Sequence, residues 1–458
     1  MIIPQEARTL SPQPIFIPRS EHNISRSNIS PNAVKVLYRL RDAGHRACLV
    51  GGGVRDLLLG REPKDFDVAT DARPEQIYRL FRNCRLIGRR FRLAHIHFGQ
   101  EIIEVATFRA YGTDREDSDG PTVERAEDGR ILRDNVYGGI EEDAWRRDFT
   151  INALYYDIAN FAVLDYVGGM ADLQAGLIRL IGDPAQHYHE DPVRLLRAVR
   201  FAAKLGFRID PATEAPLRQL GHLLEKIPPA RMFDEILKLF LGGCAVQTFE
   251  LLRHYRLFGW LFPATERCLS HQQRHYPKTL LIQALAGADQ RLAEGLPVSP
   301  AFLFAALLWE PLWEQLRRLQ AEGLDEHEAL QAAADPVIQA QLRHTALPRR
   351  YSLPMREIWE LQARLAVITG KRPLRLFAHP RFRAAYDFLL LRAETDDEQA
   401  VELADWWTRF LTLDQAGRVE MTQPPMAKAK AKRDKPRRRR KPRSARKDGR
   451  TVPPAPDA

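Results

Sequence analysis

Residues 49–70 read LVGGGVRDLLLGREPKDFDVAT, and this stretch indicates the fold most strongly. Its apolar start predicts a strand that ends in a tight turn at Gly51-Gly52-Gly53. Glycines leave backbone amides uncovered, and such amides can hold phosphate oxygens, as can the start of the helix that we expect over Val54 to Leu59. A tight turn alone would explain the glycines equally well. The spacing matches neither the dinucleotide-binding fingerprint nor the P-loop.

Asp65 and Asp67 follow that helix and flank the start of a predicted strand, Phe66 to Ala69. Residues two apart on a strand point to the same face, so the two carboxylates should project together. Two close carboxylates repel each other, and such a pair suits Mg²⁺ that carries substrate phosphates. A second Asp-x-Asp pair, Asp117 and Asp119, shows that the motif alone is not specific. Its place after a glycine turn and a helix favours a metal site.

Two further motifs extend the pattern, RRDFTINAL at 146–154 and EDPVRLLRAVRFAAKLGF at 190–207. With GGGVRD and DFDVAT, they resemble the bacterial class II nucleotidyltransferases of the polymerase β superfamily, over residues 30–245. These enzymes add CCA to transfer RNA or polyadenylate RNA, both without a template. The segment LIGRRFRLAHI at 86–96 resembles the poly(A) polymerase branch rather than the GKRFGT-like sequence of the CCA-adding branch.

The resemblance implies transfer of AMP from ATP to the 3′-hydroxyl of RNA, with release of pyrophosphate. Asp65 and Asp67 would hold two Mg²⁺ ions, with Mn²⁺ as an alternative. Asp148 matches a family active-site position and is assigned as the third carboxylate. Glu104, in the predicted strand IIEVATF, is a rival for that place because an acid on a neighbouring strand could also reach the metals.

The resemblance also assigns residues that bind the nucleotide. The backbone of Gly52 and Gly53, together with Arg55, would hold the β and γ phosphates, since an arginine binds phosphate oxygens in a bidentate manner. Arg146 and Arg147 would contribute to the nucleotide pocket, and the alternative for them is a solvated basic pair.

A helix that begins at Pro192 and stops at Gly206 should present Asp191, Arg194 and Arg197 on one face. Judged from the residues alone, such a polar stripe usually faces solvent. The resemblance implies instead that Asp191 and Arg194 read the edge of the incoming base, with Arg197 nearby, so that side chains replace a template.

The net charge of +10 is concentrated near the C-terminus. Residues 428–450 contain 14 Lys or Arg and two Asp, which leaves the rest of the chain at about −2. Such a run cannot bury apolar surface, so we expect disorder and a polyanionic partner, with a solubilising or localisation-like tail as the alternative. The residues expected to contact RNA are Lys432, Arg433, Arg437, Arg438, Arg439, Arg440 and Lys441.

Short β-like runs up to residue 167 and helical periodicity from Glu190 onward predict an α+β chain. A mixed-sheet nucleotidyltransferase head should precede an all-α neck and body and a disordered basic C-terminal tail. The expected parts are an irregular arm (1–28), the head (29–182), a neck that holds the base-reading helix (183–245), a helical body (246–420) and the tail (421–458).

Four cysteines without C-x-x-C spacing, and no long apolar run, predict a reduced cytoplasmic protein without a membrane span or a structural zinc. The expected partners are ATP and RNA 3′ ends, including messenger RNA, with RNA-decay proteins as further candidates and a monomer as the expected state. Two alternatives remain, a CCA-adding enzyme and a non-catalytic RNA-binding protein on the same fold.

Overall fold

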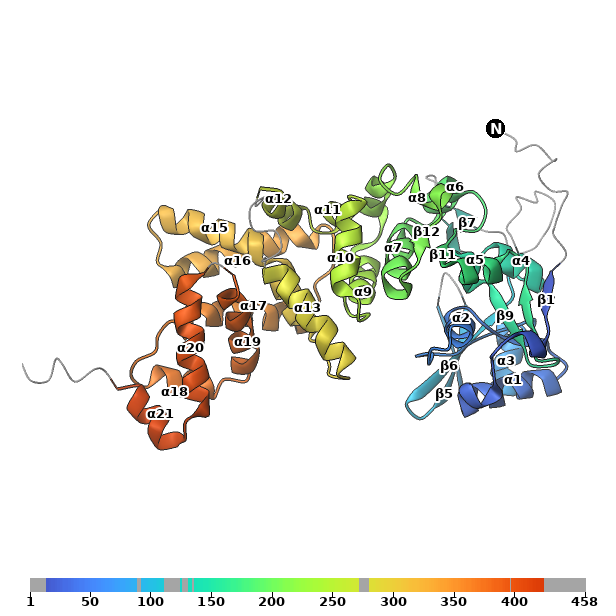
Figure 1. Ribbon diagram of the computed structural model, residues 1–458, viewed down its shortest axis with the longest axis horizontal. Coiled ribbons are helices and arrows are strands. Elements are labelled where there is room, and N and C mark those ends of the chain that lie inside the picture. The colour runs from blue at the N-terminus through green and yellow to red at the C-terminus, as the bar shows by residue number, and fades with distance from the viewer. Residues whose placement is uncertain are drawn as a thin grey trace, which may run out of the picture.

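The computed structural model describes residues 14–88, 92–110, 124–125, 131–133, 136–271, 280–395 and 397–423. The molecule is elongated, with the β-sheet at one end and the last helices at the other (Figure 1). A mixed sheet followed by a long helical part confirms the predicted α+β fold class. The predicted basic tail lies outside the described residues from 424 onward.

Eight strands form the main sheet, in the order β1-β10-β9-β2-β3-β6-β5-β4. Only β3 and β6 pair in parallel, and the other neighbours are antiparallel. The strands are β1 (Ile15–Ile17), β2 (Ala47–Val50), β3 (Asp67–Thr70), β4 (Cys84–Ile87), β5 (Leu93–Phe98), β6 (Glu101–Thr107), β9 (Leu154–Asp157) and β10 (Val163–Asp165). Two small pairs add β7 (Glu124–Arg125) with β8 (Ile131–Arg133) and β11 (Leu177–Ile178) with β12 (Arg208–Ile209).

The sheet is covered on both faces near the site. In β2, Leu49 packs into one hydrophobic cluster while Cys48 and Val50 pack into another, as the alternation of a strand requires. The helices of this part are α1 (Pro31–Asp42), α2 (Gly52–Leu58), α3 (Pro74–Leu80), α4 (Ile140–Trp145) and α5 (Gly169–Ala175). Helix α1 begins after Ser30, whose hydroxyl accepts hydrogen bonds from two backbone amides of the first turn.

Three elements differ from the sequence prediction. The arm expected to be irregular contains β1, an edge strand that pairs with β10. It has only three residues, two of them exposed, so it carries no alternating pattern. The sequence also predicts a strand over Ile151 to Tyr156, but β9 begins at Leu154 because Thr150–Asn152 form a 3₁₀ turn. Strand β12 lies within the part predicted to be entirely helical and pairs with β11, which is distant in sequence.

Helices form the rest of the described chain. They are α6 (Pro184–Glu190), α7 (Val193–Leu205), α8 (Pro211–Glu214), α9 (Pro229–Phe240), α10 (Ala245–His254), α11 (Phe258–Leu261), α12 (Pro263–His271), α13 (Leu280–Ala293), α14 (Pro300–Leu307), α15 (Trp309–Ala321), α16 (Glu326–Leu342), α17 (Arg349–Leu365), α18 (Arg372–Phe377), α19 (Phe382–Ala393), α20 (Glu398–Thr412) and α21 (Gln415–Met421). None of the helices in the described ranges is long and apolar enough to cross a membrane. A separate core around Trp407 and Phe382 joins the C-terminal helices to the end of α17.

Candidate active site

The glycine turn brings two distant pieces of the chain together. Gly51 has a φ of +75°, a left-handed value that suits glycine, and α2 begins directly after it, two residues earlier than predicted. A Cβ on Gly53 would lie 3.3 Å from the backbone oxygen of Asp65. Glycine therefore lets the Asp65-Phe66 segment lie close against the turn, which places the predicted carboxylates beside the predicted phosphate loop.

Asp67 lies next to another acid. It opens β3, and the parallel pairing with β6 puts it opposite Glu104, while Asp65 lies just before the strand. Burial, together with the nearby carboxylates of Glu104 and Asp65, raises the pKa of Asp67 to about 7. Three acids thus create a local excess of negative charge. No three metal-binding side chains among the described residues form a complete ligand set. Mg²⁺ commonly uses one or two carboxylates and takes its other ligands from water and phosphates.

His95 is a neighbour of this group that the sequence analysis did not identify. Strand β5 pairs with β6 so that His95 faces Glu104, and its Nε2 lies 3.2 Å from Glu104 Oε2. The contact depends on the register of two strands, which the sequence alone does not specify.

Asp148, the predicted third carboxylate, is held by α7. One of its oxygens accepts a hydrogen bond from Arg197 Nε at 2.6 Å. The other accepts hydrogen bonds from the backbone amide of Phe149 and from the side-chain amide of Asn152. Burial alone would raise the pKa of Asp148, but Arg197 and these hydrogen bonds outweigh it and lower that pKa. The described geometry places Glu104, rather than Asp148, in register with Asp67.

Arg55, which is expected to bind phosphates, is buried against its neighbours. Its side chain is only 2% exposed. Nε and Nη2 donate to Asp56 at 2.8 and 2.6 Å, and Nη1 donates to Asn152 at 2.7 Å. The guanidinium also lies 5.2 Å from the ring centre of Phe201 on α7. Through these three hydrogen bonds and one ring contact, Arg55 joins α2 to its neighbours. Its contact with the β and γ phosphates stays a prediction.

Arg146 and Arg147 are not a solvated pair. Arg147 donates to Asp143 and to the hydroxyl of Tyr155, and its Nη1 lies 3.8 Å from the position of a Cβ on Gly51. Burial alone would lower the pKa of Arg147, but Tyr155 and Asp143 raise it.

Arg146 lies where positive charges are concentrated. Its Nη1 is 3.5 Å from the carbonyl oxygen of Ala110. Burial, together with the neighbouring Arg109, Arg147 and Arg194, lowers the pKa of Arg146 to about 9. The repulsion among these arginines reflects a local excess of positive charge around Arg146. An anion such as a phosphate would relieve that excess.

The predicted base-reading residues are all held in place. Helix α7 starts at Val193, one residue after the predicted start, and ends at Gly206 with a φ of +72°. Asp191 accepts a hydrogen bond from Arg231 of α9 at 2.7 Å. Arg194 donates to the carbonyl oxygen of His187 at 3.0 Å and pairs with Glu190 at 3.4 Å. Arg231 was missed because it lies 40 residues away in sequence.

Known proteins share these features. Residues 47–179 match the family model described as poly A polymerase head domain. Residues 206–269 match the model described as probable RNA and SrmB-binding site of polymerase A. Residues 322–444 match the model described as polymerase A arginine-rich C-terminus. Poly(A) polymerase I of Salmonella typhi is 52% identical, over 88% of this chain and 87% of its own. Poly(A) polymerase I of Escherichia coli O157:H7 is 51% identical, over 95% of this chain and 94% of its own. The chain belongs to the poly(A) polymerase I family.

The solved structures agree on the fold of this poly(A) polymerase family member. The CCA-adding enzyme of Bacillus stearothermophilus, in complex with CTP, superimposes with a TM-score of 0.56 at 24% identity. The match covers 86% of this chain and 88% of that one. At this identity the likeness concerns the fold alone. The relatives that match over nearly the whole length are poly(A) polymerases, which confirms the branch predicted from residues 86–96.

Proposed function

We propose that the chain is a template-independent polynucleotide adenylyltransferase that transfers AMP from ATP to the 3′-hydroxyl of RNA and releases pyrophosphate. The observation that carries this proposal is a pair of opposite charge excesses at one glycine turn. Asp65 lies against Gly53 of this turn and Asp67 lies opposite Glu104, and burial together with the neighbouring carboxylates raises the pKa of Asp67. Arg147 lies beside Gly51 of the same turn, and the pKa of the adjacent Arg146 is lowered by burial and by the neighbouring arginines. A metal–triphosphate complex carries both charges and would neutralise both groups.

The acids fit a divalent metal because their oxygen ligands are the type that Mg²⁺ prefers. Asp65, Asp67 and Glu104 would hold two Mg²⁺, or Mn²⁺, and such ions lower the pKa of an attacking hydroxyl and stabilise charge on a leaving pyrophosphate. Asp67 and Glu104 lie on paired strands, so their spacing is fixed before substrate binds. Asp148 is assigned a positioning role, because it fixes Arg197.

The arginines and the glycine turn would bind the triphosphate. Arg146 lies among other cationic side chains, and Arg147 Nη1 lies 3.8 Å from the position of a Cβ on Gly51, directly before Gly52 and Gly53. Asp191 and Arg194 would read adenine, since a carboxylate accepts from an exocyclic amine and a guanidinium donates to a ring nitrogen. Arg231 and Glu190 fix the orientation of these two side chains, as a recognition surface without a template requires.

The expected partners follow from the same chemistry. RNA 3′ ends supply the attacking hydroxyl, and messenger RNA and other transcripts are the proposed substrates, with RNA-decay proteins as proposed further partners. The free cysteines Cys48, Cys84, Cys244 and Cys268 suit a reducing compartment, so we propose the cytoplasm. We propose that the enzyme acts as a monomer.

The most direct test offers each nucleoside triphosphate in turn with an unstructured RNA, and CTP with a transfer RNA that lacks its CCA end. Incorporation of CMP would contradict the proposal.

Glu104→Gln and Asp148→Asn are expected to have different effects. Glu104→Gln should raise the Mg²⁺ concentration needed for half-maximal AMP addition by about tenfold, because it removes a proposed ligand charge beside Asp67. Asp148→Asn should leave that concentration unchanged and raise the KM for ATP, because Arg197 is released near the base-reading side chains. Mg²⁺ titrations of both variants with one RNA primer check this. The opposite pattern would restore Asp148 as the third metal ligand.

Mg²⁺ binding should depend on pH through Asp67. Its pKa in the folded protein is about 7, whereas the ordinary value of 3.8 applies to the unfolded chain. Ionisation of Asp67 therefore costs stability, and this loss develops as pH rises through about 7. Mg²⁺ should stabilise the protein more at pH 8 than at pH 6, with a proton released on binding at pH 6. Thermal unfolding with and without Mg²⁺ measures the difference, and Asp67→Asn is the control that should abolish it.

A further inference from the structure

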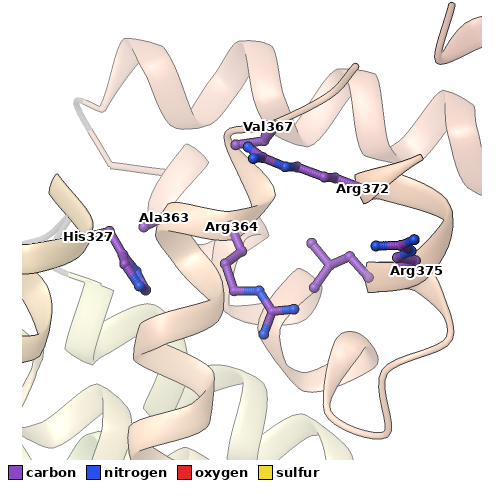
Figure 2. A pocket seen from close by; sticks show the side chains of 7 residues that line it. His327, Ala363, Arg364, Val367, Arg372 and Arg375 are labelled. Carbon is purple, nitrogen blue, oxygen red and sulfur yellow. The ribbon is translucent and has the colours of Figure 1, made fainter. Parts of the chain in front are cut away.

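A basic pocket lies at the far end of the molecule from the sheet. It has a volume of about 430 Å³ and is formed by α16, α17, α18 and the loop that joins the last two (Figure 2). Arg364, Arg372 and Arg375 surround it with His327, and Val367 and Leu376 contribute apolar wall. We call this the body pocket. In Figure 1, α18 lies at the opposite end from the β-strands that carry the proposed active site.

The arginines of the body pocket differ from their neighbours in having no acidic partner. Within the described part of the helical body, none of the three forms an ion pair, and no carboxylate lines the pocket. The nearby arginines are neutralised, as shown by the pairs Arg381–Glu357 and Arg383–Asp387. Residues 361–386 contain six Lys or Arg and no Asp or Glu. The positive charge of the body pocket is therefore left for a ligand.

The helices that carry Arg364 and Arg375 are anchored in the C-terminal core. Leu365 and Leu376 are buried in the C-terminal core, on the same helices as Arg364 and Arg375. The backbone oxygen of Leu365 accepts a hydrogen bond from Trp407 Nε1 at 3.0 Å. The three exposed guanidiniums are thus presented by helices that are themselves anchored, so less order has to be gained when a ligand binds.

The start of the basic tail points to the nature of the ligand. The amide of Gly370, in the loop beside the pocket, donates to the carbonyl oxygen of Thr422 at 2.8 Å. In the sequence, the basic run of residues 428–450 begins six residues after Thr422. A basic pocket and a basic run in the same part of the chain favour one polyanionic ligand, and the run itself has the wrong sign to fill the pocket.

We propose that the body pocket binds backbone phosphates of single-stranded RNA, upstream of the 3′ end that enters the active site. Guanidinium groups bind phosphate oxygens in a bidentate manner, and a flexible strand can bring successive phosphates to the three arginines. Because the pocket lies far from the sheet, only an RNA long enough to reach both can use it. This inference rests on the proposed function for the choice of RNA as the polyanion.

The test compares two full-length triple variants with the same loss of charge. The pocket variant is Arg364→Gln, Arg372→Gln and Arg375→Gln. The control variant is Arg318→Gln, Arg381→Gln and Arg383→Gln, which removes three exposed arginines that already have acidic partners. The affinity for a long unstructured RNA is measured by fluorescence anisotropy without ATP, at several salt concentrations. Extension of a short primer by ATP is measured in parallel.

The pocket variant should bind the long RNA about tenfold more weakly than wild type, and its log-log salt slope should fall by about 2 for three lost contacts. The control should stay close to wild type, and both variants should extend the short primer normally. Equal loss in the two variants would reduce the effect to net charge and overturn the proposal. Unchanged RNA binding by the pocket variant would also overturn the proposal. In that case, a polyglutamate peptide that binds the wild-type protein but not the pocket variant would indicate an acidic protein ligand.

Two observations keep the test independent of folding and of the proposed function. The two variants should unfold at the same temperature because all six substituted side chains are exposed. If the pocket variant unfolds at a lower temperature, the single variants Arg372→Gln and Arg375→Gln are used in its place, and each should lose less RNA affinity than the triple variant. Absence of AMP addition to the short primer by wild type would contradict the proposed function, while the anisotropy result would still decide whether RNA binds in the pocket.

Discussion

Asp67→Asn is expected to lower kcat for AMP addition by about 10³-fold while it makes the metal-free protein more stable. The loss of activity follows from removal of a metal ligand between Asp65 and Glu104. The gain in stability follows from the raised pKa of Asp67, because a buried carboxylate beside two others is costly when ionised. Primer extension in saturating Mg²⁺ and thermal unfolding in chelator, both at pH 8, measure the two effects.

Asp42→Asn is the matched control, because Asp42 is exposed and pairs with Arg41 at the end of α1. It should change neither quantity. If Asp67 were an ordinary structural carboxylate, Asp67→Asn would lower the stability of the protein. If Asp67 had no role, the substitution would change neither activity nor stability. Either result for Asp67→Asn would remove the acids from the proposed mechanism. The combination of lower activity and higher stability is specific to a site that holds like charges together for a cation.

The sequence alone was sufficient to predict features that depend on residues close together along the chain. The start of α1 could be predicted because the Ser30 side chain caps amides only two and three residues away. The glycine turn and β3 could be predicted for the same reason, since a left-handed φ and a short run of residues typical of strands are local properties. The pairing of Asp67 with Glu104 could only be weighed as an alternative, because it depends on which strands become neighbours and in which register.

Predictions about charged side chains were less reliable, since a charged residue looks the same in the sequence whether it binds a substrate or a neighbour. Asp148 and Arg197 were both assigned to the active site, but nothing in the sequence indicates that they bind each other across 49 residues. The cations of the tail could be identified because 14 of them are consecutive or nearly so. The body pocket could not, because its arginines stand out only when the acidic partners of their neighbours are known.

Arg55→Met is expected to destabilise the protein by about 3–5 kcal/mol in free energy of unfolding, because it leaves buried acceptors without their donor. Asp56 would keep only Lys204, at 3.7 Å, and the side-chain oxygen of Asn152 would lose its bond of 2.7 Å. The KM for ATP of the protein that remains folded should change little if the guanidinium stays bound to Asp56 and Asn152 in the working enzyme. Denaturant unfolding and kinetics at low temperature measure both quantities.

Two comparisons separate this structural role from phosphate binding. Arg61→Met removes an exposed arginine just after α2, whose guanidinium contacts the backbone oxygen of Lys204, and should cost little stability. Adding Asp56→Leu to Arg55→Met should restore part of the lost stability, because an unpaired buried charge costs more than an apolar side chain in its place. A phosphate ligand would behave in the opposite way: Arg55→Met would raise the KM for ATP strongly at unchanged stability, and the second substitution would restore nothing. The burial of Arg55 against Phe201 favours the structural result, because a guanidinium in that position can reach a triphosphate only if α2 separates from α7.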